Sequence, residues 1–386
     1  MELKSLKFNY FAFALLFLFI APSSAWLDSV AQRGKNFGQL SANMGKGIVQ
    51  NVPNMIPSPE SIFRLSKQGL LGLPTEALLT AIDKVCSYAT AARNSTMPYK
   101  QPKLEEMNYV LMTDTENISI PVTESLRLWR HEKFDPQKKV VVMVTGWNSD
   151  IDEENSAADG LWAAYRSRGD TNFVLIDTAR YVDTLYAWSA FNTMDLGHGL
   201  GLGLTELADV VPIDNIHVMG HSLGAHIVGF AGRVFQEKTD RILKRISGFD
   251  PARPCFREGE VLQGLGRGDA EFVDIIHSNS GALGKTDPIG DADFYPNGIV
   301  SVMPGCVSFL CSHSRAWKYY AESVYKGNEM NFIAKKCGSL YSYETNACIR
   351  KEIPMGFSCP STAKGNFFLK TNSHSPFGRG KFSLFK

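Results

Sequence analysis

The chain has little net charge and few long apolar runs. Its 386 residues carry a formal net charge of +1, so the sequence gives no sign of a basic surface for nucleic acid. Beyond the N-terminus, no stretch approaches the roughly 20 apolar residues that a membrane-spanning helix needs. The sequence also lacks internal repeats and low-complexity tracts. With 44% apolar residues, it instead predicts a globular protein that buries a large core.

The first 25 residues, 1–25, have the pattern of a secretory signal peptide. Lys4 and Lys7 precede a short apolar core at 11–20, and small residues at 23–25 form a cleavage site. This core is too short to cross a bilayer. We therefore expect a secreted, extracellular protein without a transmembrane anchor.

Seven cysteines in an exported chain predict disulfides and one unpaired thiol. Cys306 and Cys311 would close a small loop of four residues, while Cys337 and Cys348 could pair in a turn-rich tail. Spacing leaves the pairing of three others open, namely Cys86, Cys255 and Cys359. Two N-glycosylation sequons lie in polar surroundings and begin at Asn94 and Asn117.

Residues 26–103 form a leader unlike the rest of the chain. Amphipathic patterns at 61–71 and 75–88 predict two short helices. We expect this leader to pack on the neighbouring domain, and a partner-binding arm is the alternative.

The main domain is expected at 104–386, where continuous apolar runs alternate with helical patterns. Such runs are typical of strands buried on both faces, and the alternation predicts an α/β fold with a mainly parallel sheet. A glycine-rich stretch, 197–203, interrupts one helix-like region. The predicted strands lie at 108–113, 139–145, 172–177, 216–218, 246–250 and 272–277.

Residues 214–233 hold the strongest catalytic signal. A short apolar run ends in Gly220-His221-Ser222-Leu223-Gly224, and a proline-free helical pattern follows. A serine at such a strand–turn–helix junction projects from the sheet towards a helix N-terminus, whose backbone N–H groups can hold an oxyanion. Ser222 is therefore the expected nucleophile.

A serine nucleophile needs a histidine base and an orienting carboxylate, which follow it in the order Ser, Asp, His in α/β-hydrolases. Asp250 ends the strand after the Ser222 helix, at the carboxyl edge where ligands bind. His313 lies at a helix start, whereas His277 ends a strand and is expected to be structural. His221 and His226 flank Ser222, and we expect both to point away from it.

From about Val110 onwards, the sequence resembles the animal pancreatic-lipase superfamily. The likeness rests on GHSLGAHIVGFAGR, ISGFDPARPCF, FVDIIH, DADFYPNG and CSHSRAWKYYAES, and within the superfamily LQGLGRGDAEFVD looks closest to insect lipase-like proteins related to fly yolk proteins. The resemblance implies an α/β-hydrolase fold with Ser222, Asp250 and His313 as the catalytic triad. It also implies an oxyanion hole formed by the backbone N–H groups of Trp147 and Leu223.

The sequence departs from the family pattern in three places. Thr145 stands where family lipases usually carry a histidine, and Val261 and Gly266 replace two ligands of the vertebrate calcium loop, which leaves Asp269. We therefore expect no metal and no cofactor. The chain is also expected to lack a C-terminal β-sandwich domain, and with it any colipase-like partner.

Two functions fit this pattern. The first is a secreted esterase that cleaves lipid acyl esters through an acyl-enzyme at a membrane or lipoprotein surface. The second is a yolk-type lipid-binding or storage protein with little or no activity. The complete triad favours the enzyme, and the short 306–311 loop, which corresponds to the family's lid, favours a phospholipase A1-like preference over triglyceride.

Overall fold

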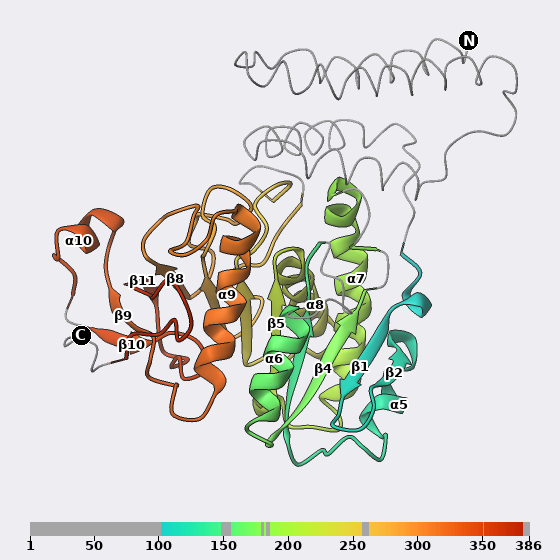
Figure 1. Ribbon diagram of the computed structural model, residues 1–386. Helices are drawn as coiled ribbons and strands as arrows, with labels where there is room; N and C mark the ends of the chain where they lie inside the picture. The colour runs from blue at the N-terminus through green and yellow to red at the C-terminus, as the bar shows by residue number, and fades with distance from the viewer. Residues whose placement is uncertain are drawn as a thin grey trace, which may run out of the picture. The chain divides into compact units, whose positions relative to one another are not determined.

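The computed structural model describes residues 102–147, 156–178, 181–182, 186–256, 262–349 and 351–380 (Figure 1). The predicted signal peptide, nearly all of the leader with its two helices, and the sequon at Asn94 lie outside the described residues. In the part of the chain that the structure describes, no helix is long and apolar enough to cross a membrane.

The described residues form an eleven-stranded sheet with the order β10-β9-β11-β8-β7-β6-β5-β3-β4-β1-β2. The strands from β11 to β4 run parallel, and antiparallel pairs flank them at both ends. The α/β fold with a mainly parallel sheet is thus confirmed. The bounds are β1 (Asn108–Met112), β2 (Ile118–Pro121), β3 (Lys139–Val144), β4 (Thr171–Asp177), β5 (Ile216–His221), β6 (Arg245–Phe249), β7 (Phe272–Ile276), β8 (Ala292–Pro296), β9 (Ile333–Lys336), β10 (Glu352–Pro354) and β11 (Gly365–Leu369).

The central strands are apolar on both faces because helices cover both faces. Five of the six residues of β3 are buried, and so are all five of β7. Alternate residues of β3 belong to two different apolar cores: Val142 packs on one side of the sheet and Met143 on the other. This two-sided burial explains why the strands read as continuous apolar runs in the sequence.

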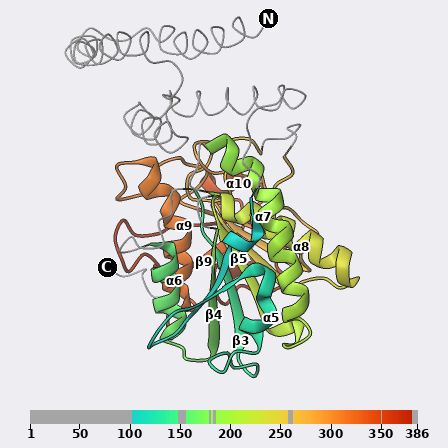
Figure 2. The same cartoon turned by 90° about the vertical axis from the view of Figure 1, so that its right-hand side faces the viewer.

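Helices α5, α7 and α8 cover one face, and α6 and α9 cover the other (Figure 2). Three 3₁₀ turns and the small helix α10 complete the described elements. The bounds are η2 (Leu104–Glu106), η3 (Val122–Glu124), α5 (Ser125–Trp129), α6 (Ala157–Arg166), α7 (Tyr186–Leu207), η4 (Ile213–Asn215), α8 (Leu223–Thr239), α9 (Phe309–Val324) and α10 (Leu340–Glu344).

The expectation that glycines interrupt the region at 197–203 is wrong, because α7 runs through it without a break. The glycines allow tight packing of neighbouring elements. A Cβ added to Gly197 would lie 2.4 Å from Cβ of Phe230 on α8, and one added to Gly203 would collide with Tyr109 on β1. The lost helix propensity of glycine is offset by this close contact between α7 and α8.

The predicted disulfides Cys306–Cys311 and Cys337–Cys348 are both present. Cys255 is also disulfide-bonded, while Cys359 is a buried free thiol. Burial raises the pKa of the Cys359 thiol, which keeps it protonated and unreactive.

Candidate active site

Ser222 lies at a strained turn between β5 and α8. Its φ of 57° and ψ of −121° are unusual for a residue with a side chain. The turn is tight because Gly220 and Gly224 approach each other: a Cβ on Gly220 would lie 2.3 Å from the carbonyl oxygen of Gly224. The Gly-x-Ser-x-Gly spacing therefore serves a backbone contact that larger residues would prevent.

Asp250 follows β6 at the same edge of the sheet and is fully buried. Its Oδ1 accepts hydrogen bonds from the backbone N–H groups of Ser278, at 2.7 Å, and Asn279, at 2.9 Å. The other oxygen, Oδ2, lies 2.5 Å from Nδ1 of His313. The carboxylate thus has one oxygen held by the chain and the other directed at the histidine.

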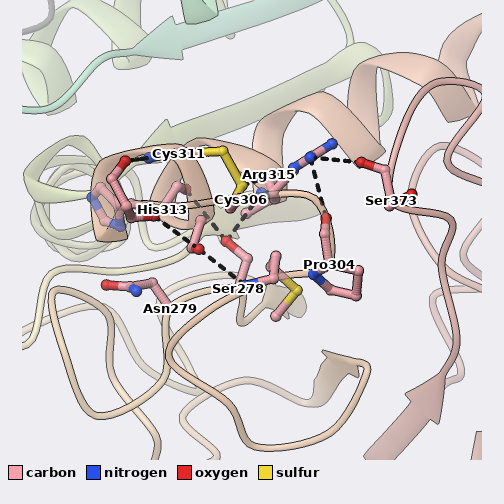
Figure 3. The surroundings of a disulfide bond; sticks show 12 residues. Ser278, Asn279, Pro304, Cys306, Cys311, His313, Arg315 and Ser373 are labelled. Atoms are coloured by element: carbon pink, nitrogen blue, oxygen red, sulfur yellow. Dashed lines mark hydrogen bonds between the residues drawn. A yellow bond between two sulfur atoms is a disulfide. The ribbon is translucent and has the colours of Figure 1, made fainter.

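His313 lies in the first turns of α9, which begins within the Cys306–Cys311 loop (Figure 3). Ser308 caps this helix, since its hydroxyl accepts the backbone N–H of Cys311 at 3.1 Å. The ring of His313 lies next to that of His221, the residue before Ser222, with ring centroids 4.6 Å apart. Residues from β5, β6 and α9 therefore meet at one place, as the predicted triad requires.

The loop after β3 lies directly against Ser222. A Cβ on Gly146 would lie 2.5 Å from Cβ and 3.0 Å from Oγ of Ser222. Leu223 is the first residue of α8, where a backbone N–H has no partner within the helix. The half-buried Trp147 packs against the same apolar cluster as Leu223. Both predicted oxyanion-hole residues thus flank the serine.

The other buried histidines have structural partners. His277 lies 2.8 Å from the Lys285 carbonyl oxygen and 2.9 Å from the Asp293 carboxylate, so its predicted structural role is confirmed. His226 bonds the backbone of Ala252 and Leu265, and burial lowers its pKa to about 3.

The expectation that His221 points away from the site is wrong. Side chains alternate along a strand, so His221 shares a face with His217 and Met219, and α9 covers that face. Burial and the neighbouring His313 hold the pKa of His221 well below its usual value. The alternation of side chains along β5 could have placed His221 on this face from the sequence.

In the segment that corresponds to the vertebrate calcium loop, Asp269 pairs with an arginine. Arg233 on α8 donates to Asp269 Oδ1 at 2.7 Å, and the Gly266 N–H donates to Oδ2 at 2.9 Å. Val261 lies outside the described residues. Asn117, the other predicted glycosylation site, is exposed between β1 and β2 and remains a prediction.

The sheet order, the strained turn at Ser222 and the Asp250–His313 pair define an α/β-hydrolase. More particularly, the chain belongs to the lipase family, whose model matches residues 80–377. It is 35% identical to vitellogenin-3 of Drosophila melanogaster over 235 residues, which cover 60% of this chain and 56% of that protein. The chain spans about half the length of the vitellogenins it matches.

Vertebrate lipases are also similar to this chain. Pancreatic triacylglycerol lipase of Cavia porcellus is 28% identical over 321 residues, 73% of this chain and 67% of that protein. Lipase member H of Oryctolagus cuniculus is 35% identical over 205 residues, 50% and 43% of the two chains. A match to a putative carboxylesterase from Lactobacillus plantarum has 16% identity and a TM-score of 0.25, and it covers 38% of this chain and 66% of that one.

Proposed function

We propose that this chain is a secreted serine esterase that hydrolyses the acyl ester of a lipid. The observation that carries the proposal is the Asp250–His313 hydrogen bond, formed beside the strained turn at Ser222. Membership of the lipase family and similarity to two vertebrate lipases support a lipid as the substrate. Secretion rests on the signal-peptide pattern at 1–25.

The proposed reaction passes through an acyl-enzyme. His313 takes the hydroxyl proton of Ser222 at Nε2 while Oγ attacks the ester carbonyl carbon, and Asp250 stabilises the imidazolium. Backbone N–H groups of Trp147 and Leu223 donate to the oxyanion. The C–O bond then breaks, and the leaving alcohol receives the proton from His313. Water, deprotonated by His313, attacks the acyl-enzyme, and Ser222 regains its proton as the fatty acid leaves.

A yolk-type lipid-binding protein is the competing function, and the 35% identity to vitellogenin-3 favours it. A fluorophosphonate probe separates the two, because it reacts with an activated serine and not with an ordinary hydroxyl. We expect one label per folded molecule, located by peptide mapping at Ser222. Folded wild-type protein that takes up no label would favour the binding protein.

Within the lipid esters, we propose a phospholipase A1-like preference. The Cys306–Cys311 loop encloses four residues, which span at most about 14 Å when extended. Its exposed apolar side chains are few: Val307 is fully exposed and Leu310 is 55% exposed. Since α9 already begins at Phe309, this loop is too short to act as a hinged cover for a lipid-sized groove.

The substrate preference is tested by initial rates on phosphatidylcholine and triolein, below and above the concentrations at which each aggregates. We expect sn-1 cleavage of the phospholipid, slow hydrolysis of triolein and little increase in rate at the interface. Wild-type protein that leaves phosphatidylcholine intact and accelerates sharply on triolein droplets would contradict the phospholipase proposal, while the esterase proposal would stand.

A further inference from the structure

The backbone carbonyl of His313 receives two side-chain hydrogen bonds that the triad itself does not explain. The hydroxyl of Ser278 donates to it at 3.3 Å, and Nε2 of His221 lies 3.2 Å from it. Both donors are almost completely buried, and they come from different strands of the sheet, since Ser278 follows β7 and His221 ends β5. The first turns of α9 are thereby attached to the sheet at the residue that carries the catalytic imidazole (Figure 3).

Ser278 also contacts the acid of the triad. Its backbone N–H donates to Asp250 Oδ1 at 2.7 Å, while its hydroxyl accepts the backbone N–H of Ala316 at 3.1 Å. One fully buried residue therefore holds the carboxylate with its main chain and the helix of the base with its side chain. Ser278 thus links the element that carries Asp250 directly to the helix that carries His313.

His221 can also hold the helix of His313 in place, because its surroundings fix its tautomer. A carbonyl oxygen can only accept, so Nε2 must carry the hydrogen, and the buried Nδ1 has no hydrogen-bond partner. Burial and the nearby His313 also lower the pKa of His221, which keeps the ring neutral. A neutral ring beside the catalytic histidine adds no charge that would oppose formation of the imidazolium.

We propose that Ser278 and His221 are positioning residues that hold His313 between Asp250 and Ser222. The inference rests on the proposed esterase function. Nucleophilic attack needs the base within hydrogen-bond reach of the serine, and a displacement of about 1 Å can lower the rate by about 10²-fold. Loss of either donor should therefore slow the chemical step and leave substrate binding unchanged.

The test compares Ser278→Ala with a matched variant, Ser323→Ala. Ser323 is also fully buried, donates to a carbonyl of α9 (Tyr320, 2.6 Å) and accepts a backbone N–H (Phe357, 3.0 Å), but it lies at the other end of the helix. Both variants lose the same group, so their melting temperatures should fall by similar amounts. A soluble short-chain p-nitrophenyl ester serves as the substrate, and fluorophosphonate titration gives the concentration of folded sites.

We expect Ser278→Ala to lower kcat by about tenfold to a hundredfold with KM within about twofold, and Ser323→Ala to keep the wild-type kcat. His221→Phe, which keeps a ring against His313 but no donor, should lower kcat in the same way. If Ser278→Ala does not fold, Ser278→Cys replaces it in the comparison. Equal kcat values for the two serine variants would overturn the inference, whereas a wild-type protein without esterase activity would overturn the proposed function as well.

Discussion

Gly146 packs so closely against Ser222 that no residue with a side chain would fit at its position. Since an added Cβ would meet Cβ of Ser222 at 2.5 Å, the absence of a side chain lets the loop after β3 reach the serine. Trp147, whose N–H we propose as an oxyanion donor, follows Gly146 in this loop. The geometry around Ser222 therefore depends on glycines that allow close backbone contacts. It also depends on buried polar groups with defined hydrogen-bond partners.

Gly146→Ala should therefore damage the oxyanion hole more than the fold. We expect kcat to fall by about 10²–10³-fold, the usual loss for one oxyanion donor, because the methyl group must displace the loop or Ser222. Gly338→Ala is the control, because a Cβ there meets nothing within 4 Å. Steady-state kinetics on a soluble ester test this, and wild-type kcat in Gly146→Ala would contradict the assigned loop.

Three histidines have a lowered pKa in the folded protein. Burial lowers the pKa of His217, His221 and His226 below the ordinary value, so the unfolded chain binds protons that the folded chain does not. Their stabilisation is complete above about pH 6.5 and is lost as the pH falls towards the folded values. Three such groups should lower the free energy of unfolding by roughly 3 kcal/mol between pH 6.5 and 5.5.

Urea denaturation at these two pH values measures this difference. In His226→Gln, whose side chain can still reach the backbone of Ala252 and Leu265, the difference should shrink by about a third because one of the three protons is removed. An unfolding free energy that does not change between the two pH values would contradict the assignment.

At the scale of elements, α8 carries both the catalytic turn and the arginine that closes the neighbouring loop. The Arg233 guanidinium lies over the Phe230 ring at 4.3 Å and pairs with Asp269, so the carboxylate already has a cationic partner. We expect activity to be insensitive to calcium chelators. Arg233→Ala should lower the free energy of unfolding by about 1–3 kcal/mol, because Asp269 is then left buried without that partner.

Chelator titration of the wild-type esterase activity tests the calcium prediction. Loss of activity that calcium alone restores would show a metal requirement and contradict it. Arg233→Ala is then measured by urea denaturation at constant pH, and an unchanged unfolding free energy would show that the ion pair does not stabilise the loop.

The elements also show how far the sequence could predict the structure. Parallel strands such as β3 and β7 were predictable because burial on both faces leaves a continuous apolar run. The continuity of α7 was not, since its glycines suit a contact with α8 that a local pattern cannot contain. The Asp250–His313 pair was predictable from motifs at the end of β6 and the start of α9. Ser278 was missed because its contacts are with three residues distant in sequence.

In the sheet as a whole, three parallel pairings, β3 with β5, β5 with β6 and β6 with β7, place the ends of these four strands side by side. The oxyanion loop, Ser222 and Asp250 follow three of these strands, and α9 adds His313 from the face opposite α7 and α8. The sheet thus collects residues more than 160 positions apart in the sequence at one edge. This convergence is what the esterase proposal requires.

The central claim is that Ser222 is the nucleophile, and the kcat of Ser222→Ala tests it most directly. We predict that hydrolysis falls by about 10⁶-fold, the loss seen when a serine hydrolase loses its nucleophile, while the melting temperature stays close to that of the wild type. Folded Ser222→Ala protein that hydrolyses esters at the wild-type rate would contradict the claim.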